Sequence, residues 1–268
     1  MLPRPVVPAL LVPLLLIGGC ATAPAAPALP PADAVVDYQL GGAYDPADDV
    51  GGVVRDATAP PAPGLYSVCY LNGFQTQPSE RSVWLEQRSD LVLTAEGEPV
   101  IDENWPDELI LDISTGAKRS AIAGLQEPAI RGCAASGFDA VEFDNLDSFT
   151  RSGGAFDDED ALDLAARYVR IAHDAGLAAA QKNTAELGER GRDTAGFDFA
   201  VVEECQRFDE CAAYTAVFGD AVIDIEYSDD LPGGFAEVCA DPTVPASTIL
   251  RDRDLTVPSH PDYVFERC

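Results

Sequence analysis

The chain has 268 residues, 47% of them hydrophobic, so it is long enough to bury a core as one large domain or two small ones. Asp and Glu number 46 against 17 Lys and Arg, which gives a formal net charge of −29 at pH 7. Because phosphate binding requires clustered cations, this balance excludes nucleic acid as a partner and favours a cationic one. Excess carboxylates also keep proteins soluble, and the net charge alone does not separate the two interpretations.

The N-terminus predicts export and lipid anchoring. In residues 1–19, Arg4 precedes an apolar run that is too short to span a bilayer well. The ending Ile17-Gly18-Gly19-Cys20 resembles the lipobox of bacterial lipoproteins, which implies cleavage before Cys20 and lipidation of its thiol. The mature chain would then be held on the outer face of the bacterial cell membrane by lipid alone. An ordinary secretory signal with an incidental cysteine is the alternative.

Residues 20–33 are rich in Ala and Pro and predict an extended tether, so the folded domain is expected over 34–268. Short apolar runs there predict eight strands, at 35–40, 65–72, 108–114, 139–145, 177–183, 198–205, 221–227 and 247–250. Apolar residues at helical spacing predict helices over 118–136 and 160–175, ended by Gly137 and Gly176.

Strands that alternate with helices indicate a parallel sheet of the α/β class. Eight such units fit a single-domain (β/α)8 TIM-type barrel. The alternative is a doubly wound open sheet, but Gly41 and Gly42 after the first run lack the GxGxxG spacing of its phosphate turn.

Six cysteines remain after Cys20, and an even number in an exported chain indicates disulfides. Six cysteines allow 15 pairings. The short separation of Cys205 and Cys211 favours a local loop, and the terminal Cys268 is suited to tying the tail to Cys239. Elimination then pairs Cys69 with Cys133. Zinc binding is disfavoured because the chain has two His residues and no CxxC pair.

Acid or amide side chains end nearly every predicted strand, at the edge where barrel enzymes hold their sites. The acids and amides are Asp37, Gln39, Asn72, Asp112, Glu142, Asp144, Asn145, Gln181, Asn183, Glu203, Glu204 and Glu226, and Lys182 and Tyr227 stand among them at the same strand ends. Any one of them could serve as a cap or a loop acceptor. Their convergence, without a Ser-His-Asp arrangement, favours glycoside chemistry by two carboxyl groups.

Three basic side chains are candidates for catalytic groups. His173 lies within a predicted helix and His260 in a Pro-flanked tail, so both are expected to be structural. Lys182 follows an apolar run, where its charge would be costly unless it is paired with carboxylates. Such a pairing would keep the neighbouring acids ionised, with or without contact to substrate.

Six blocks resemble the glycoside hydrolase family 114 domain, the endo-α-1,4-polygalactosaminidase family. They are YSVCYLNGF (66–74), WPDELILDI (105–113), GFDAVEFDNLDSF (137–149), AHDAGLAAAQKN (172–183), FDFAVVEECQRFDEC (197–211) and IEY (225–227). The blocks occur in order through nearly the whole domain. The resemblance implies a TIM-type barrel that cleaves α-1,4-linked galactosamine-containing polysaccharide internally, without metal or organic cofactor.

In such barrels the acid pair comes from the ends of the fourth and sixth strands. The matching positions imply that Asp144 is the nucleophile, or the base of an inverting enzyme, and that Glu203 is the general acid/base. Glu204 is the rival to Glu203, because adjacent strand residues face opposite sides. The segment after 66–72 departs from the commoner family pattern, which has an acidic residue and an Arg there, and this weakens the transfer of substrate identity.

The expected partner is a cationic or partly deacetylated aminosugar polysaccharide, and the expected state is a monomer. Its ammonium groups would be drawn to a cleft lined by Asp112, Glu142, Asp147 and Glu226. Two alternatives stay open: a glycan-binding lipoprotein that has lost turnover on the same barrel, and a hydrolase of another α-linked glycan.

Overall fold

The structure is a computed structural model that describes residues 26–32 and 34–268. The predicted signal peptide and the lipidation site Cys20 lie outside the described residues. The main sheet has nine strands in the order β1-β2-β3-β6-β7-β8-β9-β10-β11. The strands are β1 (Val36–Tyr38), β2 (Gly52–Asp56), β3 (Tyr66–Asn72), β6 (Ala140–Asp144), β7 (Ala178–Lys182), β8 (Phe199–Glu203), β9 (Val222–Tyr227), β10 (Ser247–Arg251) and β11 (Phe265–Arg267). The first eight pair in parallel, and β11 pairs antiparallel with β10.

This curled sheet matches the predicted (β/α)8 TIM-type fold. Its order leaves β1 and β11 as the two edges, and Arg251 of β10 reaches across to β1, where its guanidinium donates to the backbone oxygen of Tyr38 and lies 3.1 Å from Asp37 Oδ1. Both charged side chains are buried. The first and eighth parallel strands are therefore joined through side chains.

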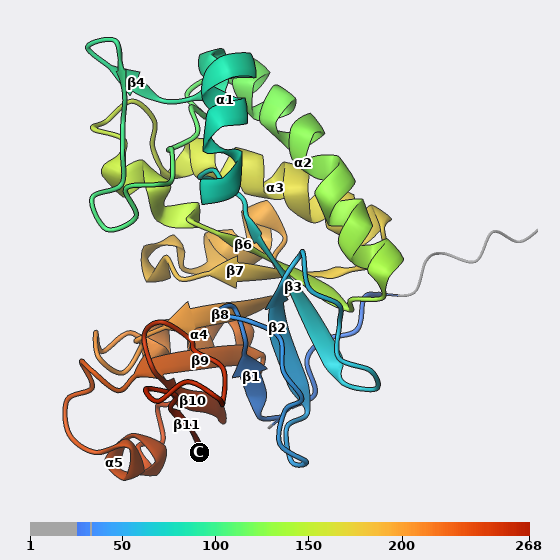
Figure 1. Cartoon of the computed structure of the whole chain (residues 1–268), viewed down its shortest axis with the longest axis vertical. Helices are drawn as coiled ribbons and strands as arrows, with labels where there is room; N and C mark the ends of the chain where they lie inside the picture. Colours follow the sequence, from blue (N-terminus) through green and yellow to red (C-terminus); the bar gives the residue numbers. More distant parts are fainter. Residues whose placement is uncertain (1–25, 33) are drawn as a thin grey trace, which may run out of the picture.

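Helices cover the sheet unevenly (Figure 1). They are α1 (Arg81–Gln87), α2 (Gly116–Ser136), α3 (Asp158–Asp174), α4 (Cys211–Phe218) and α5 (Phe235–Ala240). Short helical turns are η1 (Pro78–Glu80), η2 (Ser89–Leu91), η3 (Leu146–Arg151), η4 (Ala185–Leu187) and η5 (Gly191–Ala195), and a small hairpin pairs β4 (Thr94–Ala95) with β5 (Glu98–Pro99). The long α2 and α3 pack on each other beside β3, β6 and β7.

Local sequence accounts for the ends of the long helices. The Asp157 side chain accepts from the backbone N–H groups of Glu159 and Asp160, and the Asp160 side chain accepts from the Asp157 backbone N–H, so the two residues form a capping box at the start of α3. Thr115 caps α2 by accepting from the Lys118 N–H, and Gly137 ends it in the left-handed conformation at φ 94°.

Two sequence predictions about strands were wrong. Residues 108–114 form no barrel strand; Leu109, Ile110 and Leu111 make isolated antiparallel bridges to loop residues. The strand β2 was missed, because its five residues adjoin a Pro-rich loop and no helix separates β2 from β1 or β3. The two errors compensate, so β6 and β8 are still the fourth and sixth parallel strands.

The three predicted disulfides are confirmed: Cys69–Cys133, Cys205–Cys211 and Cys239–Cys268. Cys69–Cys133 joins β3 to α2, and Cys239–Cys268 joins α5 to the C-terminal residue. Each closed loop removes conformational freedom from the unfolded chain, so the longest loop is expected to stabilise most.

Candidate active site

The barrel interior is apolar at its floor and charged at its mouth. One buried cluster takes side chains from all eight parallel strands, including Val36, Ala140, Ala178, Phe199 and Ile223. Because strand residues alternate between faces, every second residue from these positions also points inward. On β6, β7 and β8 the alternation ends at Asp144, Lys182 and Glu203. The carboxyl ends of three neighbouring strands therefore bring these side chains into one place.

Lys182 is the centre of this group. It is 2% exposed, and its Nζ lies 2.9 Å from Glu142 Oε1, 3.1 Å from Glu203 Oε2 and 3.5 Å from Asp144 Oδ1. It also donates to the Tyr38 hydroxyl at 2.8 Å. One ammonium group thus holds the two predicted catalytic carboxylates beside each other, with Glu142 beneath them.

Burial works against the charge of Lys182, but the surrounding carboxylates Asp144, Glu142 and Glu203 raise its pKa well above the usual value. The lysine is therefore an ammonium ion at neutral pH. Glu142 is wholly buried, and this burial raises its pKa to about 7 although Lys182 acts in the opposite direction. Glu142 has no exposure to the cleft and serves to hold Lys182.

Two tyrosine hydroxyls orient the carboxylates. Tyr70 donates to Asp144 Oδ2 at 2.6 Å, and Tyr227 donates to Glu203 Oε1. Burial, followed by the adjacent carboxylate, raises the pKa of both phenols well above the usual value, so both stay protonated and act as donors. Asn183 Oδ1 accepts from the Glu203 backbone N–H at 2.8 Å, which fixes the end of β8.

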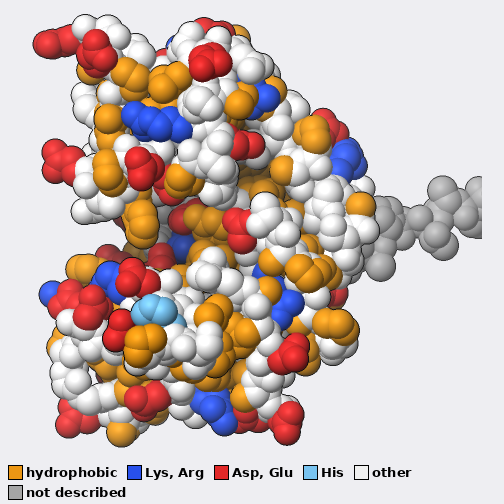
Figure 2. All heavy atoms as spheres, viewed as in Figure 1, with side chains coloured by type: hydrophobic (Ala, Val, Ile, Leu, Met, Phe, Trp, Pro, Cys, Tyr) orange, Lys and Arg blue, Asp and Glu red, His pale blue; other side chains and the backbone are white. Residues whose placement is uncertain are grey.

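A cleft passes over these residues. It consists of a cavity of about 740 Å³ and an adjoining one of about 470 Å³. Glu203, Tyr227 and Asn183 line both, whereas Asp144 and Lys182 line the smaller one. Figure 2 shows the molecule hollowed between the two halves of this face, with acidic side chains around the hollow. Glu203 therefore stands at the junction of two compartments, and Asp144 faces one of them.

The cleft includes eight of the residues predicted from the sequence. They are Asp144, Asn145, Asp147, Lys182, Asn183, Glu203, Glu204 and Tyr227. Glu204, with its backbone at φ 61°, pairs with Arg253 at 2.9 Å and makes no ion pair with Lys182 among the described residues. This geometry favours Glu203 over Glu204 as the acid.

Seven other predicted residues do not line the cleft. Two of them are amides: Gln39 donates to Asp37, and Gln181 donates to the backbone oxygens of Asn183 and Thr184. Glu142 lies beneath Lys182, Asp37 bonds to Arg251, and Asp112 pairs with Lys118 at the start of α2. Asn72 donates to Glu108 at 2.8 Å, and Glu226 accepts from the Gln206 backbone N–H at 2.7 Å. Alternation explains Asp37 and Glu226, because the inward residues of their strands are Tyr38 and Tyr227.

Both histidines are away from the cleft. His173 on α3 contacts Asp198, with 2.8 Å between Nε2 and Oδ2, and this hydrogen bond raises the pKa of His173. His260 lies in the exposed C-terminal segment and accepts from the Asp262 backbone N–H. Neither residue lines either cavity.

Several cleft residues were missed by sequence reasoning. Trp105 is 60% exposed and lines both cavities, and Phe208 is 56% exposed and lines the larger one. Glu108 lines the smaller cavity, and Arg253 lines both. All four lie on loops, where no periodic pattern marks an inward position. The one sequence signal that could have identified Trp105 is the presence of a Trp within the otherwise polar stretch 102–108.

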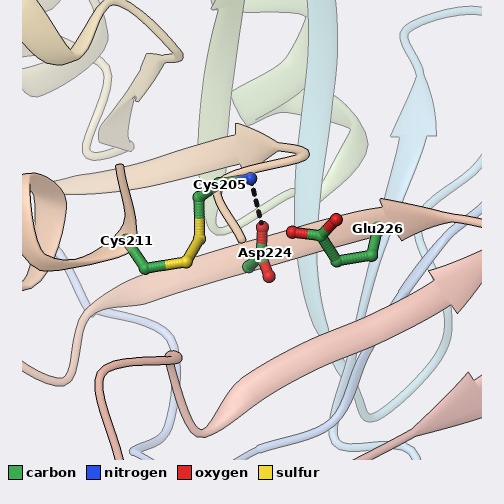
Figure 3. A group of neighbouring side chains, drawn as sticks. All are labelled: Cys205, Cys211, Asp224 and Glu226. Carbon is green, nitrogen blue, oxygen red and sulfur yellow. Dashed lines mark hydrogen bonds between the residues drawn. A yellow bond between two sulfur atoms is a disulfide. The ribbon is translucent and has the colours of Figure 1, made fainter. Parts of the chain in front are cut away.

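A second acidic group lies on the face of β9 that points away from the barrel interior (Figure 3). Ligand atoms of Cys205, Cys211, Asp224 and Glu226 all lie within 4.8 Å of one another. The two sulfurs form a disulfide, and Asp224 accepts from the Cys205 backbone N–H at 3.4 Å. A cysteine binds a metal ion as a free thiolate, and the sulfurs of a disulfide are not thiolates. Only the carboxylates of Asp224 and Glu226 therefore remain as metal ligands in this group.

The described residues contain no helix that is both long and apolar enough to cross a membrane.

The sequence profile of glycoside-hydrolase family GH114 matches residues 19–268. No curated protein sequence matches this chain at a significant level.

Three solved structures share the fold. Aspergillus fumigatus Ega3, crystallised in complex with galactosamine, is 18% identical, with a TM-score of 0.67 over 93% of this chain and 100% of that chain. The glycoside hydrolase domain of PelA from Pseudomonas aeruginosa is 15% identical, with a TM-score of 0.59 over 86% of this chain and 97% of that chain. The maltogenic α-amylase AmyB from Thermotoga neapolitana is 11% identical, with a TM-score of 0.52 over 84% of this chain and 72% of that chain.

Proposed function

Since the chain belongs to glycoside-hydrolase family GH114 and is a glycosidase, we propose that it cleaves α-1,4-linked galactosamine-containing polysaccharide at internal bonds, with Asp144 and Glu203 as its carboxylate pair. The observation that carries this proposal is the shared ammonium group of Lys182, which contacts both carboxylates inside one cleft. Two carboxyl groups on either side of a scissile bond are what glycoside hydrolysis requires.

The two cavities suggest how the sugar chain lies. Asp144 faces the smaller cavity, so the sugar whose anomeric carbon reacts would occupy that compartment. Glu203 borders both cavities, so it can donate a proton to the glycosidic oxygen between them, and the leaving chain would extend into the larger cavity. Space for sugars on both sides of the bond supports internal cleavage.

We infer a double displacement with retention. Lys182 Nζ lies 3.5 Å from Asp144 Oδ1 and 3.1 Å from Glu203 Oε2, so these two oxygens are close enough to allow the carboxyl spacing of about 5–5.5 Å found in retaining enzymes. In this route Asp144 bonds to the anomeric carbon while Glu203 protonates the leaving oxygen, and Glu203 then takes a proton from the water that releases the sugar.

The charge of the protein supports a cationic substrate. The net charge is −29, and carboxylates line both cavities. Such a surface would attract the ammonium groups of a deacetylated polymer and raise its encounter rate. Ega3, which shares the fold, was crystallised with galactosamine.

The test is release of reducing ends from deacetylated polygalactosamine, compared with its N-acetylated form and with α-linked glucans. We expect release from the deacetylated polymer by the wild type, and loss of about 10³-fold or more in Asp144→Asn and Glu203→Gln. Absence of release by the wild type, with binding retained, would favour a glycan-binding lipoprotein. Preferential cleavage of another polymer would favour a different α-linked substrate.

Export and lipid anchoring through Cys20 are part of this proposal and rest on the N-terminal sequence. The expected location is the outer face of the bacterial cell membrane, and the expected state is a monomer. Labelling with a radioactive fatty acid should mark the wild type and not Cys20→Ser. A molar mass of twice the chain mass in light scattering would contradict the monomer.

A further inference from the structure

The carboxylate of Glu108 stands in the smaller cavity without a cation. It is half-buried, and its Oε2 accepts from Asn72 Nδ2 at 2.8 Å and from Asn145 Nδ2 at 3.5 Å. Among the described residues, no Lys or Arg forms an ion pair with it. Asn145 directly follows Asp144, so this carboxylate is tied to the backbone next to the proposed nucleophile.

Most other carboxylates of the cleft already have a cation. Asp144 and Glu203 share Lys182, and Glu204 pairs with Arg253. Arg151 binds Asp102 at 2.9 Å and Asp147 at 2.8 Å. The protein therefore neutralises the acids on both sides of Glu108 and leaves Glu108 to amide partners.

Two further carboxylates in the smaller cavity lack an ion pair in the described chain. Asp254 is exposed to solvent, and Asp56 accepts from the Thr58 backbone and hydroxyl within its own turn. Neither shares a hydrogen bond with the residues around Asp144. Glu108 is thus the unpaired acid that a sugar bound against Asp144 would meet.

We infer that Glu108 binds the ammonium group of the amino sugar that sits beside Asp144, and so makes the enzyme selective for a deacetylated unit at that position. This inference rests on the proposed function, because it requires an amino sugar in the cleft. A carboxylate held by two amides keeps acceptor capacity for an N⁺–H donor, and charge-assisted hydrogen bonds are about twice as strong as neutral ones. An N-acetyl group would offer a neutral amide instead of the ammonium.

The electrostatic environment supports this role. Burial raises the pKa of Glu108 to about 7, and the negative charges of Asp144 and Asp102 act in the same direction. The hydrogen bond from Asn72 and the positive charge of Arg151 act in the opposite direction and lower the pKa. A carboxyl group with a raised pKa carries charge above about pH 7 and loses it below. Binding of a cationic sugar through Glu108 should therefore weaken as the pH falls through 7.

The test compares wild type, Glu108→Gln, Glu108→Asp and Glu103→Gln on galactosamine oligomers at pH 6, 7 and 8. Glu103 lies on the same loop, is exposed and lines neither cavity, so its substitution controls for the lost charge. At pH 8 we expect Glu108→Gln to raise KM about 10-fold with kcat changed less than about 3-fold. The ratio of the KM of Glu108→Gln to that of the wild type should be largest at pH 8 and should fall toward 1 at pH 6, because the substrate amines titrate equally for both proteins and only the wild type loses the charge of Glu108. Glu108→Asp should follow the wild type.

A KM of Glu108→Gln within about 2-fold of the wild type at pH 8, with melting temperatures equal, would overturn the inference. So would an equal rise in KM for Glu103→Gln. If the wild type binds the oligomers without cleaving them, the proposed hydrolase is wrong, and the same comparison of Kd by calorimetry still tests Glu108. If the wild type does not bind the oligomers at all, both proposals fall.

Discussion

Replacement of Lys182 by Met tests how the site is held together. Met has a similar length and no charge, so the change removes the ammonium group with little loss of volume. The Lys182 Nζ lies 2.9 Å from Glu142 Oε1, and both side chains are buried. The substitution therefore leaves a buried carboxylate without its cation, and it leaves Asp144 and Glu203 as like charges without a shared partner.

The magnitude follows from that geometry. Removing one partner of a buried ion pair costs about 3–5 kcal/mol, because the other charge stays desolvated. Burial already raises the pKa of Glu142 to about 7 in the presence of Lys182, so without the lysine the pKa will rise further. The folded variant then holds a proton that the unfolded chain releases above its pKa of about 4.5. Its stability must fall as the pH rises, so the loss should be larger at pH 8 than at pH 5.

Urea denaturation at the two pH values, with reducing-end release as the activity assay, separates stability from catalysis. We expect Lys182→Met to lose about 4 kcal/mol of unfolding free energy at pH 8. We also expect its rate of reducing-end release to fall about 100-fold or more. Adding Glu142→Gln removes the stranded charge and should restore most of the stability, while activity stays low. If Lys182→Met is as stable as the wild type at pH 8, or if the double variant is fully active, Lys182 does not hold the carboxylates as described.

Three further predictions concern the cleft and the acidic group on the outward face of β9. Glu204→Gln should keep at least about one fifth of the wild-type rate of reducing-end release, because its carboxylate pairs with Arg253 and not with Lys182; a loss of 10³-fold would identify it as the acid instead. Trp105→Ala should lower kcat/KM about 10-fold at an unchanged melting temperature, since the exposed ring lines both cavities and offers a stacking surface for sugars; unaltered kinetics would refute this role. Burial raises the pKa of Glu226, which lies beside the buried Asp224, so the wild type loses stability as the pH rises above the ordinary pKa of a glutamate, and Glu226→Gln should be more stable than the wild type at pH 8 but not at pH 4.5. The exposed Glu266→Gln is the control in urea denaturation, and an equal gain there would contradict the explanation.

The strand ends were predictable because they combine two strong local signals. On β6 and β8 an apolar run of alternating inward and outward residues ends in an acid, and parallel strands bring their carboxyl ends to one edge. This pattern marked Asp144, Lys182 and Glu203 without knowledge of the loops. The same logic left Glu203 and Glu204 unresolved, because a shift of one residue exchanges the faces; the contact with Lys182 distinguishes them.

The loop residues could not be predicted for a physical reason. Glu108 and Trp105 belong to a segment whose apolar residues resemble a strand, yet these residues bridge to loop residues and form no barrel strand. The position of the segment depends on contacts between distant residues, such as the hydrogen bond from Asn72 to Glu108. The pattern of apolar residues within the segment gives no information about contacts with distant residues, so it could not predict where the segment lies. The sequence also predicted that Glu142 lines the substrate cleft. Glu142 is the inward-facing residue before Asp144 on β6, so it lies one layer deeper and is buried beneath the cleft.

The assignment of Asp144 as nucleophile and Glu203 as acid/base is tested most directly by identifying the residue that becomes attached to sugar. Glu203→Gln, supplied with an α-glycosyl fluoride of a galactosamine oligomer, needs no acid to expel fluoride but lacks the base for the second step. We expect a glycosyl-enzyme to accumulate and mass spectrometry of its peptides to find the added sugar on Asp144. Attachment to Glu204 or another residue, or turnover of the fluoride with inverted product and no adduct, would contradict this assignment.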